Sequence, residues 1–279
     1  MRVALFIFAV YTTSMEERDE NTQLQTQSAR QNRIIELIQR DGHVRVPDLS
    51  KVLGVSKITI RRDLALMEKK NLLERTHGGA ISTKRIYKEI SYNNRSDQEL
   101  ENKDAIARLA AELINEGDTV FINGGSTTYH IFRYIKSSNV KLVTTNPGCI
   151  GQFTSPEIEL ILAGGRYYPD SNSFYGGFTT GILNQVNASK AIIGVHGISC
   201  RFGLTTPMHY AAEATRLMIN RTRGEVIVVA DHRKIGLVSD YVTAPVDRIN
   251  TLITDYFPEK EYIKDFEDLG IKVIQTTPQ

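Results

Sequence analysis

Cysteine is scarce in this 279-residue chain, which also lacks a long internal run of apolar residues. Cys149 and Cys200 lie far apart without a C-x-x-C spacing, which argues against a disulfide framework and against a thiolate zinc site. The histidines lack the i, i+4 spacing that gathers a metal site. We therefore expect two structural cysteines, a reducing compartment, no metal and no cofactor.

The most apolar stretch is the first one, M-R-V-A-L-F-I-F-A-V-Y, and it is too short to span a bilayer. No A-x-A cleavage site follows it, which argues against a signal peptide. We expect residues 1–29 to be a disordered or misassigned start, with Met15 as the initiator. A cytoplasmic protein without a membrane partner is predicted.

A strong overall charge is also missing, because the formal net charge is only +2. Residues 30–85 nevertheless hold thirteen Lys or Arg against six Asp or Glu, which leaves about −5 for the rest of the chain. The length favours two domains, and the hydrophobic content of 41% allows ordinary packed cores. Such a charge distribution is expected where one domain alone meets phosphate.

The basic segment has the signals of three helices. Apolar residues mark one face of a helix over about 30–40, and Pro47 opens a second helix where its missing N–H costs nothing. Gly54 supplies the left-handed turn that leads to S-K-I-T-I-R-R-D-L at 56–64. This third helix is predicted to bury an apolar stripe and to expose its cations. The stripe consists of Ile60, Leu64 and Met67.

The exposed face of the third helix is a candidate DNA-recognition surface. Ser56 is expected to cap the helix, which places the next residues on the early turns that enter a major groove in helix-turn-helix proteins. Residues 72–76 and the tight turn at 77–80 form a candidate wing. A solvated basic face is the alternative for the helix arginines, and a structural hydrogen bond is the alternative for His77. The candidate DNA-binding residues are Ser56, Lys57, Thr59, Arg61, Arg62, Arg75 and His77.

From Lys103 onward, helical stretches alternate with short apolar runs. A striped helix leads to a strand at 119–122, and N-G-G-S-T-T at 123–128 follows directly. Short strands joined by helices favour a parallel sheet with ligand-binding loops at the strands' carboxyl ends. Further strands are predicted near 140–144, 159–162, 190–195, 225–230, 251–254 and 272–274, with helices over 210–221 and 260–269.

The glycine-rich turn at 123–128 exposes backbone N–H groups at the positive end of a helix, and its three hydroxyls add donors. This geometry suits a phosphate, and a plain structural turn is the alternative. The turn is not a Walker A loop, because no G-K-[ST] closes it. Polar groups also follow other strands, at 144–146, 164–166, 196–197 and 231–234.

Two strings at their particular spacing resemble the DeoR family of bacterial transcription regulators: V-S-K-I-T-I-R-R-D-L at 55–64 and R-T-H-G-G-A at 75–80. The resemblance extends to about residue 275. It implies an α/β protein with a small winged helix-turn-helix domain and a larger α/β sensor domain, similar in fold to ribose-phosphate isomerase and coenzyme A transferases. The expected boundaries are 30–85 for the DNA-binding domain, 86–102 for a linker and 103–279 for the effector-sensing domain.

The family's effectors are typically phosphorylated sugars, polyols or related metabolites. By resemblance, the glycine-rich turn is the phosphate cradle, Lys234 is a cation that meets the ligand, and two acids hold hydroxyls or shape the pocket. The effector-binding residues that the resemblance implies are Asn123, Gly124, Gly125, Ser126, Thr127, Thr128, Thr145, Asn146, Glu213, Asp231 and Lys234.

The chain departs from the family pattern at two strings. Asn123 stands where the family commonly has aspartate, so a neutral amide replaces a charged acceptor. The familiar D-S-S-K appears as D-H-R-K, which puts His232 and Arg233 beside Lys234. We hypothesise that the added positive charge favours a more anionic ligand, such as a bisphosphate or a sugar-acid phosphate. The alternative is that both side chains face solvent.

The related isomerases use closely spaced carboxylates as a general base, and no acid lies between Lys190 and Glu213 here. His196 could serve as a base, but a lone histidine at a strand end is more often a pocket donor. We therefore expect a regulator and no enzyme; an isomerase-like enzyme with an appended DNA-binding domain is the alternative. The predicted function is repression of a sugar or polyol operon by a homodimer or homotetramer on double-stranded operator DNA.

Overall fold

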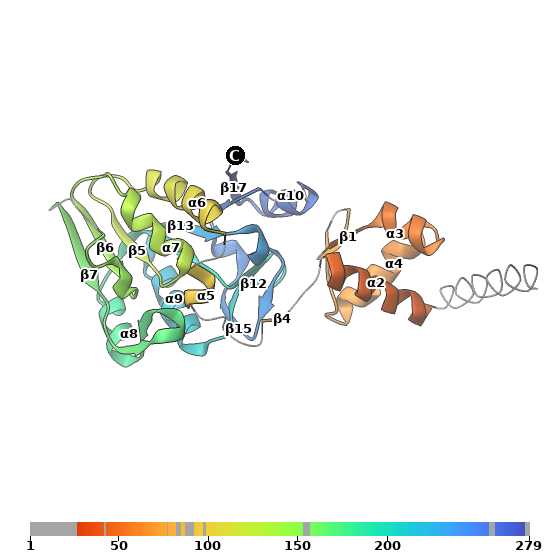
Figure 1. The fold of residues 1–279 in the computed structure, drawn as a ribbon, viewed down its shortest axis with the longest axis horizontal. Helices are drawn as coiled ribbons and strands as arrows, with labels where there is room; N and C mark the ends of the chain where they lie inside the picture. Colours follow the sequence, from red (N-terminus) through yellow and green to blue (C-terminus); the bar gives the residue numbers. More distant parts are fainter. Residues whose placement is uncertain are drawn as a thin grey trace, which may run out of the picture. The chain divides into compact units, whose positions relative to one another are not determined.

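The computed structural model describes residues 27–41, 43–76, 78–81, 85–86, 92–96, 99–152, 157–256 and 260–276. The chain divides into two compact units, one up to Thr83 and one from Lys84. Figure 1 labels the helices and strands of both units. His77 and residues 1–26, on which two sequence predictions fall, lie outside the described residues.

The first unit contains three helices and a small antiparallel sheet in the order β1-β3-β2. The three predicted helices are confirmed, although the first one begins at Gln27, three residues before its predicted start. The predicted wing takes the form of the β2–β3 hairpin. The elements are α2 (Gln27–Asp41), β1 (His43–Arg45), α3 (Val46–Leu53), α4 (Lys57–Lys69), β2 (Glu74–Arg75) and β3 (Gly79–Ile81).

Apolar side chains from all three helices form the core of the first unit. The stripe predicted for α4 is buried, with Ile60, Leu64 and Met67 each at most 1% exposed. Gly54 ends α3 with φ 65°, as its left-handed turn requires. An ion pair also ties α2 to α4 inside this unit: Arg30 Nε lies 2.5 Å from Asp63 Oδ2, and both side chains are buried.

A seven-stranded sheet forms the centre of the second unit, in the order β17-β16-β13-β10-β5-β6-β7. Every neighbouring pair is parallel, as predicted, so the carboxyl ends of the strands meet at one edge. The strands that the apolar runs predicted are all in this sheet. They are β5 (Thr119–Ile122), β6 (Val140–Thr144), β7 (Ile158–Leu162), β10 (Ala188–Gly194), β13 (Thr222–Ala230), β16 (Thr251–Thr254) and β17 (Lys272–Gln275).

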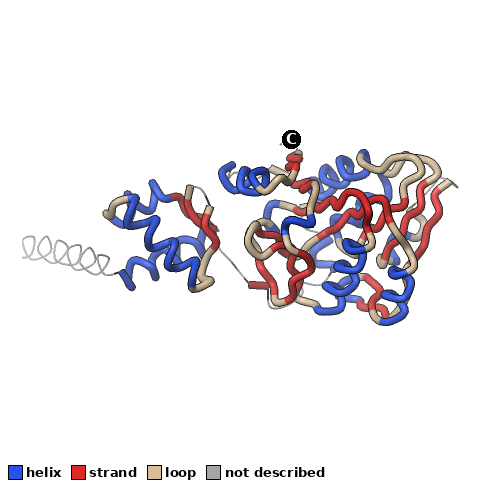
Figure 2. The backbone as a smooth tube through the Cα atoms, turned by 180° about the vertical axis from the view of Figure 1, so that it is seen from behind, coloured by secondary structure: helices blue, strands red, loops and turns tan. Residues whose placement is uncertain are grey.

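Helices cover both faces of this sheet (Figures 1 and 2). Alternate strand residues such as Val120 and Ile122 pack against α6 and α7, whereas Phe121 points to the opposite face. Helix α9 contacts β10 and β13, and α8 packs on α9. No described helix is long and apolar enough to cross a membrane. The helices are α6 (Leu100–Glu112), α7 (Ser126–Ile131), α8 (Gly177–Asn184), α9 (His209–Asn220) and α10 (Lys260–Asp268).

Several short elements of the second unit fall outside the predicted strands and helices, because most of them span only two or three residues. One of them is β4, which pairs in parallel with β14. The range expected to be a linker, 86–102, therefore contributes part of β4, all of α5 and the start of α6 to this unit. The short elements are β4 (Arg85–Ile86), α5 (Tyr92–Ser96), β8 (Arg166–Tyr168), β9 (Ser173–Tyr175), β11 (Gly197–Ser199), β12 (Gly203–Thr206), β14 (Val238–Ser239) and β15 (Tyr241–Ala244).

Replacing Asp63 with alanine should destabilise the first unit by about 3 to 5 kcal/mol, because the guanidinium of Arg30 would remain buried without its carboxylate. Amide hydrogen exchange of the full chain measures this locally, since only protection in α2 to α4 should fall. Asp48→Ala, which removes an exposed acid from α3, is the matched control. Unchanged protection in Asp63→Ala would show that the ion pair contributes nothing to stability.

Candidate DNA-recognition helix and sensor site

The amino-terminal end of α4 is fixed by Ser56, as predicted. The Ser56 hydroxyl accepts a hydrogen bond from the backbone N–H of Thr59 at 3.2 Å and lies 2.9 Å from the Thr59 hydroxyl. Ser56 itself is extended, with φ −64° and ψ 151°, which is the ordinary N-cap conformation. The cap therefore sets where the helix begins and which side chains occupy its first turn.

Four side chains of this first stretch face outward. Lys57, Arg61 and Arg62 are exposed, and none of them forms an ion pair with a described residue. Ile58 is 77% exposed, so its apolar side chain is accessible to a partner. A cationic helix face with one exposed apolar residue offers both phosphate contacts and an apolar contact for a thymine methyl group.

The wing contributes one described cation, Arg75 on β2. Its backbone N–H donates to Glu68 Oε1 at 3.0 Å, and its guanidinium lies 3.9 Å from the same carboxylate. The Arg75 side chain is 40% exposed. Arg75 is thus oriented by α4 and remains accessible to a partner.

The predicted phosphate cradle lies between β5 and α7, at the carboxyl edge of the sheet. Thr128 Oγ1 donates to the carbonyl of Asn123 at 2.8 Å, so this hydroxyl closes the turn. A Cβ at Gly124 would lie 1.7 Å from Ser173 Oγ, so the close approach of this loop requires glycine. Ser126 and Thr127 are buried at the start of α7, and their hydroxyls make no hydrogen bond to a described residue.

Asn123 joins the ends of β5 and β10. Its Oδ1 accepts the backbone N–H of Gly194 at 2.8 Å, and its Nδ2 donates to the carbonyl of Gly194 at 2.9 Å. The same Nδ2 lies 3.3 Å from Thr215 Oγ1 on α9. A carboxylate could accept the first bond but could not donate the second. The two bonds to Gly194 therefore explain why this chain has an amide and not a carboxylate at position 123.

Thr145 and Asn146 follow β6 at the same edge, and both are at most 1% exposed. Asn146 Oδ1 accepts the backbone N–H of Gly148 at 2.9 Å. Thr145 Oγ1 and Asn146 Nδ2, in contrast, have no hydrogen-bond partner among the described residues. Buried polar atoms of this kind are rare in folded proteins, and they mark a place where a polar ligand would complete the site.

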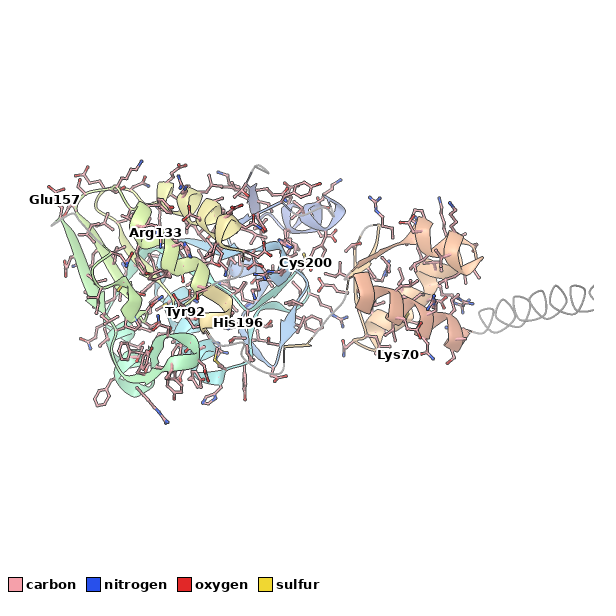
Figure 3. All side chains as sticks on the ribbon, in the orientation of Figure 1. Lys70, Tyr92, Arg133, Glu157, His196 and Cys200 are labelled. Carbon is pink, nitrogen blue, oxygen red and sulfur yellow. The ribbon has the colours of Figure 1, made fainter. Side chains whose placement is uncertain are left out.

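A cleft is lined by the ends of β5 and β10 together with residues of β9, β12, α9 and β15, and it includes His196, which Figure 3 labels. His196 Nδ1 lies 3.1 Å from Thr206 Oγ1 on β12. No carboxylate occurs among the described residues that line the cleft, and the predicted Glu213 is exposed on α9 outside this lining. The lining residues are Asn123, Gly124, Tyr175, Gly194, Val195, His196, Thr205, Thr206, Ala211, Thr215 and Thr243.

Asp231 and Lys234 follow β13 at the next position along the edge. Burial alone would raise the pKa of Asp231, which is 1% exposed, but the Arg233 guanidinium and the nearby lysines hold this pKa below its usual value. Arg233 Nε and Nη2 each lie 3.1 Å from this carboxylate. His232 Nδ1 lies 2.6 Å from Asp255 Oδ2, a contact that raises the pKa of His232.

The two residues that depart from the family string are thus held by carboxylates. Arg233 pairs with Asp231, and His232 pairs with Asp255. Their positive charge is therefore largely balanced within the chain. Asp231 also belongs to the family string, so the hypothesis that these two side chains favour a more anionic ligand stays a prediction.

Sequence reasoning missed two cations of this region: Lys103 at the start of α6, which lies near Asp231, and Arg95 on α5, which lies near Lys103. Lys103 is 1% exposed, and its ammonium group donates to the carbonyl of Arg95. A signal for Lys103 exists in the sequence, because it lies three and seven residues before the buried Ile106 and Ala110, on the same helix face. No comparable signal exists for Arg95, which belongs to a five-residue helix.

No group of three or more metal-ligating side chains occurs in the described part of the chain. Cys149 and Cys200 are both free thiols. Burial raises the pKa of the Cys149 thiol to about 11, so this group stays protonated and unreactive at neutral pH.

Comparisons with known families cover most of the chain. A family model of the DeoR-like helix-turn-helix domain matches residues 30–85, and a model of the DeoR C-terminal sensor domain matches residues 98–256. The HTH-type transcriptional regulator GolR of Listeria innocua is 31% identical over 250 residues, covering 88% of this chain and 96% of GolR. The HTH-type transcriptional repressor GlcR of Bacillus subtilis is 31% identical over 244 residues, covering 87% and 94%.

Solved structures share less with this chain. Ribose 5-phosphate isomerase A from Methanocaldococcus jannaschii has a TM-score of 0.36 and 15% identity, over 50% of this chain and 55% of the isomerase. The beta subunit of eIF2B from Chaetomium thermophilum has a TM-score of 0.37 and 15% identity, over 55% of this chain and 48% of that subunit. The chain thus spans about half the length of each.

Replacing Asn123 with aspartate should destabilise the second unit by about 1 to 3 kcal/mol at neutral pH, because a carboxylate oxygen would face the Gly194 carbonyl without a proton to donate. The folded-state pKa of the new carboxyl would be raised, so its unfavourable effect should grow as pH rises and shrink as pH falls. Urea unfolding at two pH values measures the difference. Asn187→Asp, at an exposed loop position, is the control. An equal loss of stability in both variants would show that the Asn123–Gly194 hydrogen bonds are not the cause.

Proposed function

The chain belongs to the DeoR family of transcriptional regulators, and from this membership we propose that it represses a sugar or polyol utilisation operon under the control of a phosphorylated metabolite. The observation that carries the DNA-binding part is the outward face of α4. There, Lys57, Arg61 and Arg62 are exposed, and no described carboxylate pairs with them. A helix of this kind, capped at its first turn, is the element that enters a major groove in helix-turn-helix proteins.

Each side chain on this face has a distinct role in the proposal. The cations contact phosphate oxygens or the O6 and N7 acceptors of guanine, and the exposed Ile58 meets a thymine methyl group. Arg75 contacts the sugar-phosphate backbone from the wing. One such module buries too little surface to hold an operator alone, so two copies acting on adjacent half-sites are part of the proposal.

The metabolite site is proposed for the carboxyl edge of the parallel sheet. The glycine-rich turn, the unpaired polar atoms of Thr145 and Asn146, and the ammonium group of Lys234 all lie at this edge. Neighbouring strands are about 4.8 Å apart, so the ends of β5 and β13, with β10 between them, are separated by about 10 Å. A phosphorylated sugar can reach from one to the other.

Binding without turnover is the proposed chemistry of this site. Isomerisation of a sugar phosphate needs a general base beside the carbon that loses its proton. The described cleft lining offers no carboxylate, and the nearby carboxylate of Asp231 is engaged by Arg233. Incubation with pentose and hexose phosphates tests the alternative, because any product formed by the purified protein would establish an enzyme.

Replacing Arg61 or Arg62 with alanine should weaken binding to an operator duplex by about 1 to 3 kcal/mol where the arginine contacts a base. Replacing an arginine that contacts phosphate should instead reduce the slope of log affinity against log salt concentration by about one. The duplex is first selected from a random pool by the wild-type protein, and fluorescence anisotropy then measures affinity at several salt concentrations.

Arg33→Ala is the matched control for this experiment, because Arg33 is an exposed arginine of the same unit on α2. Its removal should leave the affinity nearly unchanged. Equal affinities for wild type, Arg61→Ala and Arg62→Ala would remove α4 as the recognition helix.

Replacing Lys234 with alanine should abolish the rise in melting temperature that an effector causes, because the ligand would lose its charge-assisted contact. The measurement is a thermal-shift screen against phosphorylated sugars and polyols, with Lys136→Ala as a control at an exposed position. A retained shift in Lys234→Ala would exclude this cation from the site. Loss of operator binding in the same variant would assign Lys234 a structural role.

A further inference from the structure

The β8–β9 hairpin lies against the carboxyl ends of β5 and β6. Its two strands pair antiparallel, and the short turn η3 (Pro169–Ser171) lies between them. The backbone N–H of Phe174 donates to the carbonyl of Thr145 at 2.9 Å. Ser173 lies so close to Gly124 that a Cβ there would clash with its hydroxyl. The hairpin therefore contacts two parts of the proposed metabolite site.

The same hairpin also holds α5, the helix that follows β4. Arg95 Nη2 donates to the carbonyl of Asp170 at 3.4 Å. Tyr92, which Figure 3 labels, is hydrogen-bonded to the side chain of Asn172. A helix of five residues is not stable on its own, so the order of α5 depends on contacts of this kind.

Asn172 is the residue at which these two sets of contacts meet. Its φ of 47° is left-handed, a conformation that asparagine adopts more readily than most side chains. Its Oδ1 accepts a hydrogen bond from the Tyr167 hydroxyl at 2.9 Å, and its Nδ2 donates to Asn146 Oδ1 at 3.4 Å. A side-chain amide has one acceptor and two donors, so Asn172 can bond to Tyr167, Asn146 and Tyr92 at once.

The bond between Asn172 and Asn146 is long, which makes it sensitive to the state of the site. Typical N–H···O bonds measure about 2.7 to 3.2 Å, so a small shift of either amide makes or breaks this one. Asn146 Nδ2, on the same planar amide, is buried and has no partner among the described residues. A ligand that accepts a bond from this Nδ2 therefore also fixes Oδ1, the atom that faces Asn172.

We infer that the β8–β9 hairpin links the metabolite site to the order of α5, with Asn172 as the positioning residue that joins them. The inference rests on the proposed metabolite control and names its physical connection within the second unit. Helix α5 belongs to the segment that leads from the DNA-binding unit, which ends at Thr83, through β4 to α6. A metabolite that strengthens the Asn172–Asn146 bond thereby stabilises this segment.

Amide hydrogen exchange of the full chain, without any ligand, tests the link through a double-mutant cycle. Asn172→Gly keeps the left-handed backbone and removes the amide, and Asn146→Ala removes the amide that Asn172 reaches. Each variant should raise the exchange rates of α5 about twofold to tenfold, since each removes one hydrogen bond. The variant with both changes should exchange no faster than Asn172→Gly, because both changes break one connection.

Asn139→Gly is the matched control, because Asn139 is exposed and is also left-handed, with φ 54°. It should leave the exchange of α5 at the wild-type rate. If Asn146→Ala does not fold, Tyr92→Phe takes its place in the cycle, since it removes only the hydroxyl at the α5 end of the connection. Wild-type exchange of α5 in Asn172→Gly, or additive effects in the variant with both changes, would overturn the inference.

A measurement of duplex binding supplies a readout that a merely structural role would not move. The probe is an equimolar mixture of ribose 5-phosphate, fructose 6-phosphate and glycerol 3-phosphate, which represent pentose, hexose and polyol phosphates. The change in duplex affinity that the mixture causes should be about twofold to thirtyfold smaller in Asn172→Gly than in the wild type. An equal change in both proteins would also overturn the inference.

Failure of the proposed function would give a different result. A wild type whose duplex affinity ignores the mixture would contradict metabolite control by these phosphates, whatever the exchange data show. The exchange cycle contains neither DNA nor metabolite, so it would still decide whether Asn172 joins Asn146 to α5.

Discussion

The buried carboxylate of Asp231 is the charge on which the polar end of the sensor unit depends. It accepts hydrogen bonds from the backbone and guanidinium of Arg233, and it attracts Lys103 and Lys234 from two different segments. Without it, the buried Lys103 would lie beside the half-buried Arg233 and Lys234 without the carboxylate that attracts all three. The strands β13, β10 and β5 follow one another in the sheet. These charges therefore share one sheet edge with the Asn123–Gly194 hydrogen bonds and the glycine-rich turn.

The same edge gives a physical basis for an effect of a bound metabolite on the rest of the chain. A ligand changes an equilibrium only through a difference in its affinity for the two states. The segment after the DNA-binding unit is built into the sensor unit through β4 and α5, and Arg95 on α5 lies near Lys103 and Lys234. A ligand that favours one arrangement of this segment over another would meet the requirement for coupling between two sites.

Much of this fold could be predicted from the sequence. Apolar runs located the seven parallel strands, and Pro47, Gly54 and Ser56 marked helix ends through backbone chemistry that acts within a few residues. The sensor site could be predicted less well from the sequence, because burial of a charge depends on contacts between distant segments. The helix face that Lys103 shares with Ile106 and Ala110 indicates burial but not its partners, and nothing local indicates that Asn123 bonds to Gly194, 71 residues later.

Reciprocal coupling between operator and effector is the most direct test of a metabolite-controlled regulator. The measurement is the affinity of the wild-type protein for its selected duplex, without effector and with a saturating concentration of the phosphorylated compound that raises its melting temperature most. We predict a change of about five- to 150-fold, and the same factor when effector affinity is measured with and without the duplex. Identical DNA affinities under both conditions would contradict the account, because the sensor unit would then bind a ligand without controlling the affinity for DNA.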